Sequence, residues 1–283
     1  MNKTLLTLLL LFFALTTSAQ KPYDIPVWPN GAPNTNNITE PEDTINPRSF
    51  SRIKNAVLTV YPARRPNGKA IIACPGGGYS HLSMTNEGHD LAAWFNSQGI
   101  TYVVLRYRMP NGNKEVPLSD VREALRIIRS KAGEYSINKV GVMGFSAGGH
   151  LASTAATHLE GAEAPDFQIL LYPVISMDST LTHKGSVRCL LGAKPSKADV
   201  KAYSNDTRVT KTTPRCFIAL SSDDKAVPPL TNGLRYYEAL VTNGVNATLH
   251  STLMAATDGD FATVSPSSAN GPRSWKNGSA HSD

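Results

Sequence analysis

Cysteine is scarce in this sequence, which excludes the small exported proteins that are held together by several disulfide bridges. The 283 residues contain three cysteines, Cys74, Cys189 and Cys216, which are too few for a disulfide framework. A bridge between Cys189 and Cys216 is one alternative, and three buried thiols acting as small apolar side chains are the other. The cysteines and histidines also lack the spacing of a metal cluster, so we expect no metal and no cofactor.

Long apolar runs and concentrated charge are lacking as well. Beyond the first twenty residues no apolar stretch is long enough to span a bilayer, so the sequence predicts no membrane partner. The net charge of +6 is scattered, and its densest points are Arg64-Arg65 and the pair Arg106 and Arg108. Because no basic stripe is interleaved with aromatic residues, we expect no nucleic-acid partner and interpret these arginines as solvated surface.

The first twenty residues have the pattern of an export signal. Lys3 supplies positive charge, Leu5 to Leu15 is a compact apolar run, and Thr17-Ser18-Ala19 is a small-residue cleavage site. The sequence therefore predicts a signal peptide over residues 1–19 and a secreted or periplasmic mature protein.

The rest of the chain alternates predicted strands and helices. A segment rich in Pro, Asn and Thr, residues 21–55, is interpreted as an extended arm. Strands are predicted at 57–61, 70–73, 100–106, 139–145, 167–172, 215–221 and 246–250, and helices at 86–98, 117–132, 149–158 and 229–242. In the first helix Leu91, Trp94 and Phe95 are expected to face inward, and Gly99 is expected to end the helix. In the second helix Val121, Leu125 and Ile128 are expected to face inward.

This alternation predicts an α/β fold, a mainly parallel twisted sheet with helices on both faces, over residues 20–250. At 41% hydrophobic residues, the chain can bury a full core as one large domain. Residues 173–214 break the alternation and are expected to form a small lid over the carboxyl ends of the strands.

The motif most informative about chemistry is Gly144-Phe-Ser-Ala-Gly148, between a predicted strand and a helix of small residues. A G-x-S-x-G at a strand-to-helix turn is typical of the nucleophile elbow of α/β-hydrolases. Side chains two residues either side of the serine would collide with the strand and helix, and the two glycines remove them. Ser146 is therefore the candidate nucleophile; the alternative is a glycine-rich turn with an incidental serine.

A glycine loop, Cys74-Pro-Gly-Gly-Gly-Tyr79, ends an earlier predicted strand. Acyl transfer builds negative charge on a carbonyl oxygen, and glycines let backbone N–H groups face that oxygen. We expect the N–H groups of Gly77, Gly78 and Ala147 to form this oxyanion hole, where esterases carry an H-G-G-G motif; Pro75 stands where histidine is usual. A phosphate-binding loop or a plain turn is the alternative.

Two adjacent aspartates follow a strand beyond the elbow, in Ser221-Ser-Asp-Asp-Lys-Ala-Val-Pro228. The triad order of serine, acid and histidine requires a carboxylate at such a place. Asp224 is the candidate acid that orients and charge-stabilises the histidine, and Asp223 is the alternate. The other interpretation of either aspartate is a turn residue that caps the helix near Pro229.

Together these motifs resemble the bacterial acetyl-esterase branch of the α/β-hydrolases, which includes exported acetylxylan esterases and feruloyl-esterase-like enzymes often mislabelled as xylanases. The resemblance runs from about Tyr23 to His250 and is carried by the segments 28–33, 75–81, 144–152 and 223–228. It implies Ser146 as nucleophile, Asp224 as triad acid, and Gly77, Gly78 and Ala147 around the oxyanion. It also implies short-chain esters as substrates, in particular acetyl groups on plant polysaccharide such as xylan.

The resemblance fails at the general-base histidine. The family carries it in a Gly-Gly-His-Gly-Trp-Gly-Phe type loop after the last strand, and this sequence has no such loop, so the base is unknown. His250 falls inside the predicted last strand, and His281 lies in residues 251–283, which have no helical or strand period. His81, beside the glycine loop, is the alternative base, although lining the pocket explains it as well.

Residues 251–283 have the properties of a frameshift product. Codons can be chosen from Ser251 onward so that a shifted frame spells Tyr-Pro-Asn-Gly-Gly-His-Gly-Trp-Gly-Phe-Arg-Asp. Continuing through Ser274 and Trp275 gives an amphipathic helix, Glu-Trp-Thr-Glu-Glu-Leu-Glu-Lys-Trp-Leu. Met254 and Trp275 leave no codon freedom, yet the result matches the family's histidine loop and final helix. We therefore hypothesise an aberrant or disordered tail, which re-reading the gene around His250 tests.

The leading functional interpretation is a secreted serine esterase that acts on a small ester or an acetylated oligosaccharide. Two alternatives stay open at this point. One is an exported serine peptidase on the same fold. The other is a catalytically impaired protein with the α/β-hydrolase fold, because the triad histidine is missing.

Overall fold

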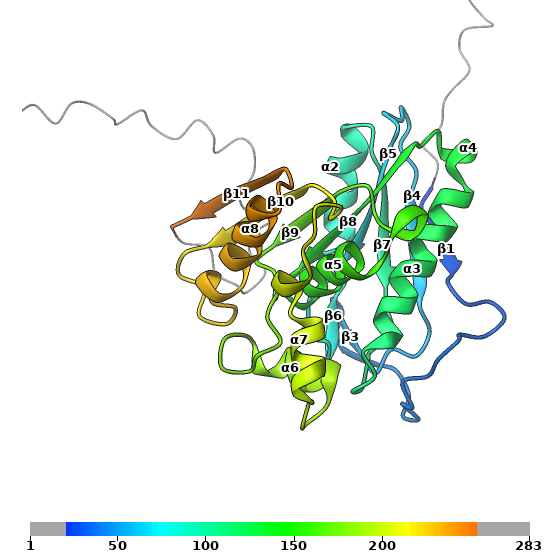
Figure 1. Ribbon diagram of the computed structural model, residues 1–283. Coiled ribbons are helices and arrows are strands. Elements are labelled where there is room, and N and C mark those ends of the chain that lie inside the picture. Colours follow the sequence, from blue (N-terminus) through cyan, green and yellow to red (C-terminus); the bar gives the residue numbers. More distant parts are fainter. Residues whose placement is uncertain (1–20, 254–283) are drawn as a thin grey trace, which may run out of the picture.

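The computed structural model describes residues 21–253, so the expected signal peptide and residues 254–283 of the expected tail lie outside it. The seven predicted strands and one more, β1, form an eight-stranded sheet with the order β1-β4-β7-β5-β8-β9-β10-β11 (Figure 1). Its strands are β1 (Tyr23–Pro26), β4 (Val57–Tyr61), β5 (Lys69–Cys74), β7 (Thr101–Arg106), β8 (Lys139–Phe145), β9 (Gln168–Leu171), β10 (Cys216–Ser221) and β11 (Ala247–Thr252). Every pair from β7 to β11 is parallel, which confirms the predicted mainly parallel sheet.

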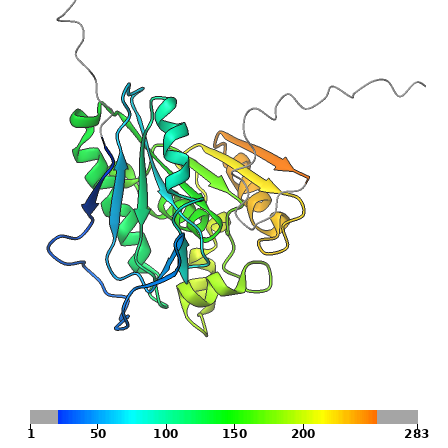
Figure 2. The ribbon, with the colours of Figure 1, turned by 180° about the vertical axis from the view of Figure 1, so that it is seen from behind.

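Helices cover both faces of this sheet, as predicted. The α-helices of the described residues are α2 (Ala92–Ser97), α3 (Glu115–Ser130), α4 (Ala132–Tyr135), α5 (Ser146–His158), α6 (Lys184–Leu191), α7 (Lys197–Tyr203) and α8 (Gly233–Thr242). The helices α3, α5 and α8 lie on one face, and α2 lies on the other (Figures 1 and 2). In α3 the buried side chains of Val121, Leu125 and Ile128 recur at helical spacing, as the sequence predicts. No helix within residues 21–253 is long and apolar enough to cross a membrane.

The N-terminal segment forms more structure than the predicted extended arm. Its first strand, β1, pairs antiparallel with β4 and so becomes the edge of the main sheet. Two further strands, β2 (Asp43–Asn46) and β3 (Ser49–Ser51), join β6 (His81–Ser83) in a small antiparallel sheet. Because β6 directly follows the glycine loop, this second sheet holds one end of that loop.

The helix predicted at 86–98 is shorter than expected, and one of its three inward residues points outward. Turns and a short 3-10 helix, His89–Leu91, precede α2. Phe95 is buried and stacks on Tyr102 with ring centroids 4.8 Å apart, whereas the Trp94 side chain is 49% exposed. The predicted stop at Gly99 is confirmed, because that residue has a φ of +75°.

The interpretation of the arginines as solvated surface is wrong for Arg108. Its side chain is only 3% exposed and forms an ion pair of 2.7 Å with the fully buried Asp120 of α3. Trp28 donates to the same carboxylate through Nε1 at 2.6 Å. This buried, hydrogen-bonded pair fastens the N-terminal segment to α3, and removing one partner alone would leave an uncompensated buried charge.

Lid helices α6 and α7 follow β9 within the predicted excursion and lie at the carboxyl ends of the strands (Figure 1). All three cysteines are free thiols, so the Cys189–Cys216 bridge is wrong. The strand β11 extends to Thr252, two residues beyond the predicted end, so the first two residues of the expected tail pair with β10.

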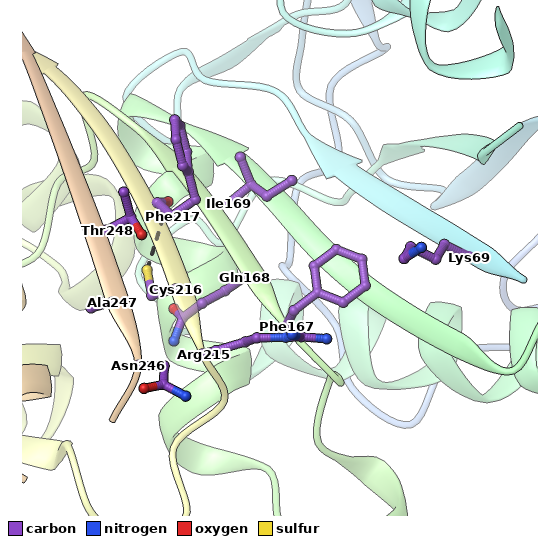
Figure 3. A pocket seen from close by; sticks show the side chains of 10 residues that line it. All are labelled: Lys69, Phe167, Gln168, Ile169, Arg215, Cys216, Phe217, Asn246, Ala247 and Thr248. Carbon is purple, nitrogen blue, oxygen red and sulfur yellow. Dashed lines mark hydrogen bonds between the residues drawn. The ribbon is translucent and has the colours of Figure 1, made fainter. Parts of the chain in front are cut away.

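One face of the sheet is open at the β9–β11 end in the described part of the chain. Phe217 of β10 is 38% exposed there, and a cavity of about 520 Å³ opens beside it (Figure 3). The cavity is lined by the first residues of several strands, such as Lys69, Gln168 and Ala247. It therefore lies at the amino ends of the strands, whereas Ser146 follows the carboxyl end of β8, so this cavity is not the catalytic pocket.

Candidate active site

Ser146 occupies the strained turn that the elbow motif predicts. It is the first residue of α5, directly after β8, and its φ is +50°, a left-handed conformation that only glycine adopts freely. A Cβ on Gly144 would lie 2.1 Å from the carbonyl oxygen of Gly148, and a Cβ on Gly148 would lie 2.0 Å from that of Cys74. Both glycines are therefore required by backbone contacts, and the Ser146 side chain stays half-buried rather than in the core.

The glycine loop lies against this elbow. A Cβ on Gly76 would be 3.1 Å from the Cβ of Ser146. Gly77 and Gly78 have φ values of +130° and +62°, and their N–H groups donate to no other described residue. The N–H of Ala147 belongs to the first turn of α5, where helix N–H groups lack intrahelical acceptors. Of the three expected oxyanion donors, Gly77 and Gly78 thus have amides without an acceptor in the described chain, and Ala147 directly follows the serine.

A buried carboxylate that the sequence analysis missed anchors the glycine loop. Glu87 is 7% exposed and accepts from the N–H of Gly76 at 2.7 Å and from the hydroxyl of Tyr172 at 2.6 Å. Burial raises the pKa of Glu87, while the two hydrogen bonds oppose that rise. Since Gly76 uses its N–H on Glu87, Gly76 is not an oxyanion donor, and the carboxylate links the loop to Tyr172, which follows the end of β9.

Asp224 is the better placed of the two candidate acids. It is 7% exposed, whereas Asp223 is exposed and accepts a hydrogen bond from Ser221. Oδ1 of Asp224 accepts from the N–H groups of Ala226 and Val227 at 2.8 and 2.9 Å, so this oxygen shapes the turn. The other oxygen, Oδ2, is buried and has no partner in the described chain. Burial raises the pKa of Asp224, and a donor at Oδ2 would stabilise its charged form.

No histidine within residues 21–253 hydrogen-bonds Ser146 or Asp224. These histidines are His81, His89, His150, His158, His183 and His250, and His281 lies outside the described residues. The alternative base, His81, shares a hydrogen bond of 3.0 Å between its Nδ1 and Ser80 Oγ. His250 is exposed on β11 and stacks on Phe217, with ring centroids 5.1 Å apart. The described chain therefore places the candidate nucleophile and the candidate acid after the carboxyl ends of β8 and β10, with no histidine bonded to either.

His150 is a buried link between the glycine loop and the lid. Its Nε2 donates to the carbonyl oxygen of Tyr203 at 2.8 Å, so its Nδ1 accepts from the hydroxyl of Tyr79 at 2.8 Å. Both ring nitrogens are engaged, and the side chain is fully buried. Burial lowers the pKa of His150 from 6.5 to about 4, so the ring is neutral at pH 7.

The neutral state of His150 predicts a loss of stability in acid. The folded state binds fewer protons than the unfolded state between pH 6.5 and about 4, so stability falls as the pH decreases through that window. The full window corresponds to about 3 kcal/mol. We expect the free energy of unfolding in urea to fall more steeply with acid in the parent than in His150→Gln. Parallel pH profiles for the two proteins would contradict a neutral buried ring.

Sequence reasoning missed Glu87, Tyr172, His150 and His183 as parts of this region. Each lies in a different segment, and single residues of these types occur in many turns and helices. The one local signal belongs to His183, which precedes the amphipathic stretch of α6 as its N-cap.

One known family matches the part of the chain that holds the candidate site. The family described as BD-FAE matches residues 58–234, which include the glycine loop, the elbow and Asp224. The chain belongs to the BD-FAE family. This membership confirms the predicted resemblance to an esterase branch of the α/β-hydrolases.

Relatives of this BD-FAE chain include enzymes named for xylan. An acetylxylan esterase from Xylanibacter ruminicola is 43% identical over 200 residues, which are 69% of this chain and 42% of that protein. An endo-1,4-beta-xylanase B from Butyrivibrio fibrisolvens is 35% identical over 175 residues, 56% of this chain and 27% of that protein. The chain therefore spans less than half the length of the curated relatives it matches.

Solved structures give the same fold over most of the described chain. An acetyl ester-xyloside bifunctional hydrolase from Caldicellulosiruptor lactoaceticus superposes with a TM-score of 0.67 at 33% identity, covering 82% of this chain and 86% of that one. A sugar hydrolase from Lactococcus lactis superposes with a TM-score of 0.58 at 29% identity, covering 75% of this chain and 81% of that one. The BD-FAE chain therefore has the α/β-hydrolase fold that the sequence predicts.

Proposed function

We propose that this chain is a secreted serine esterase that hydrolyses short-chain esters, in particular acetyl groups on a plant polysaccharide such as xylan. The observation that carries the proposal is Ser146, half-buried at a φ of +50° against a loop in which the amides of Gly77 and Gly78 have no acceptor in the described chain. The acetylxylan esterase relative and the export pattern of residues 1–19 support the substrate and the location.

The proposed reaction follows from the site's geometry. Ser146 Oγ attacks the acetyl carbonyl carbon and gives its proton to a general base, which passes the proton to the leaving alcohol. Negative charge develops on the carbonyl oxygen, where the N–H groups of Gly77, Gly78 and Ala147 stabilise it without having to reorganise. Water then attacks the acyl-enzyme, releases acetate and restores the serine hydroxyl.

The missing base is supplied, in this proposal, by the histidine of the shifted reading frame. The buried, unpartnered Oδ2 of Asp224 supports this, since a triad acid needs one free oxygen to accept from the histidine Nδ1–H. The open sheet face beside Phe217 also fits a terminal helix such as the shifted frame encodes. We call the chain that continues in this frame after His250 the frame-restored chain.

A fluorophosphonate probe and p-nitrophenyl acetate test the function. We expect the frame-restored chain to react with the probe at Ser146 and to turn over the ester, and Ser146→Ala to do neither. Mass spectrometry of the labelled peptide identifies the site. Labelling that survives in Ser146→Ala, or an absence of turnover in a folded frame-restored chain, would contradict the proposal.

The impaired protein is a second candidate for the chain as printed, because its described part holds no base beside Asp224. Without the proton acceptor, serine is a poor nucleophile, and only the oxyanion hole and substrate binding contribute to catalysis. In that case the printed chain should show weak labelling and weak turnover, while the frame-restored chain shows both strongly.

A further inference from the structure

His183 lies next to the catalytic groups without belonging to the proposed triad. A Cβ on Gly78 would be 3.2 Å from Cε1 of His183, so the imidazole ring lies beside the glycine loop. A charge on His183 would also lower the pKa of Asp224, which places the ring within electrostatic range of the proposed acid. The N-terminus of lid helix α6 thus lies close to the glycine loop and within electrostatic range of Asp224.

The hydrogen bonds of His183 decide what its ring can do. As the N-cap of α6, the side chain accepts from the N–H of Ser186 through Nδ1 at 3.2 Å, and Nδ1 lies 2.9 Å from Ser186 Oγ. Because a backbone N–H can only donate, Nδ1 carries no proton and the neutral ring holds its proton on Nε2. Nε2 has no partner within the described chain. In this position His183 is a hydrogen-bond donor and not a general base.

A polar cleft of about 590 Å³ adjoins the glycine loop at Tyr79 and Ser80. Ser80 lines it, and Ser80 Oγ is 3.9 Å from the position that a Cβ on Gly78 would take. Asn37 from the N-terminal segment, Asn111 from the loop before α3 and Arg188 from α6 line its other sides. The cleft therefore runs from the oxyanion loop outward along α6.

The walls of the cleft are tied together by hydrogen bonds. The N–H of Gly112 donates to the carbonyl oxygen of Cys189 at 2.7 Å, which joins the loop before α3 to the lid. Asn111 Nδ2 donates to the carbonyl oxygen of Asn36 at 2.9 Å, which joins the same loop to the N-terminal segment. The guanidinium of Arg188 is exposed and has no partner among the described residues, so it is available to a ligand.

We propose that this cleft binds the carbohydrate chain that carries the ester, with His183 Nε2–H donating to an oxygen of the sugar nearest Ser146 and Arg188 donating to a sugar further out. The proposal rests on the proposed esterase function. Amide groups and unpaired donors on rigid walls suit an uncharged, hydroxyl-rich ligand, because each hydroxyl both donates and accepts. A simple aryl acetate has no sugar and makes none of these contacts.

Two variants and a matched control separate recognition from structure. His183→Asn keeps a side chain that caps α6 but removes the Nε2–H donor. Arg188→Ala removes the outer donor, and Lys184→Ala removes an exposed charge of the same helix that does not line the cleft. Kinetics are measured on the printed and the frame-restored chains, with acetylated xylo-oligosaccharide and with p-nitrophenyl acetate.

We expect His183→Asn and Arg188→Ala to lower the ratio of kcat/KM for the oligosaccharide to that for the aryl acetate by about tenfold, mainly through KM. Lys184→Ala should leave the ratio and both rate constants unchanged. If His183→Asn lowered kcat/KM equally on both substrates, His183 would have only a structural role. An unchanged ratio in both variants would overturn the proposal that this cleft binds the carbohydrate chain.

Retardation in gels containing soluble xylan tests the cleft without turnover. The printed chain should be retarded by acetylated and deacetylated xylan alike, and His183→Asn and Arg188→Ala should migrate faster than the parent and Lys184→Ala. If the protein is an active esterase but xylan does not retard it, the proposed carbohydrate binding by the cleft is wrong and the proposed function stands. Retardation that depends on Arg188 in a protein without esterase activity would overturn the proposed function alone.

Discussion

The frame-restored chain is expected to hydrolyse p-nitrophenyl acetate at least about 10³-fold faster than the chain as printed. In triad hydrolases the loss of one member leaves only the catalysis that substrate binding and the oxyanion hole supply. In this chain the candidate nucleophile Ser146 lies against the glycine loop, and Oδ2 of the candidate acid Asp224 has no donor within the described residues. Adding the histidine completes the proton path, so the gain should be in kcat.

The restored histidine itself must carry this gain. A frame-restored chain with alanine in place of the histidine of its Gly-Gly-His-Gly-Trp loop keeps the terminal helix but not the base. We expect its rate to return to that of the printed chain, and Asp224→Asn in the frame-restored chain to lose most of the gain. Equal rates for the printed and the restored chains would refute the frameshift explanation.

Gly148→Ala is expected to destabilise the fold by more than about 3 kcal/mol or to prevent folding. The new Cβ would lie 2.0 Å from the carbonyl oxygen of Cys74 and 2.5 Å from that of Pro75. Both are backbone atoms at the start of the glycine loop, so no side chain can move away to make room. The loop or α5 must shift instead, which separates the oxyanion amides from Ser146.

Gly133→Ala is the matched control for this substitution. Gly133 also lies in a helix, α4, but a Cβ there would have open space around it. Alanine is favoured over glycine in a helix by up to about 1 kcal/mol, so this variant should be as stable as the parent or more so. Urea midpoints of both variants give the comparison, and equal stabilities would contradict the close packing of the elbow on the loop.

Local sequence patterns correctly predicted those parts of the fold that depend on residues close together in the sequence. The Val121, Leu125 and Ile128 spacing predicted the buried face of α3, and apolar runs predicted every parallel strand of the sheet. The errors arose where distant segments meet. Trp94 is exposed because Phe95 takes the place against Tyr102, and Arg108 is buried because Asp120, Trp28 and the N-terminal segment surround it.

By itself, the sequence determined the mainly parallel sheet and the strained serine turn. Both follow from short-range rules: apolar periodicity sets the strands, and only glycine fits beside so sharp a turn. Tertiary structure alone decided that Glu87 holds the glycine loop, that Asp224 rather than Asp223 is buried, and that the His183 ring lies beside Gly78. Those outcomes depend on which distant groups occupy each hydrogen bond, and sequence spacing carries no information about that.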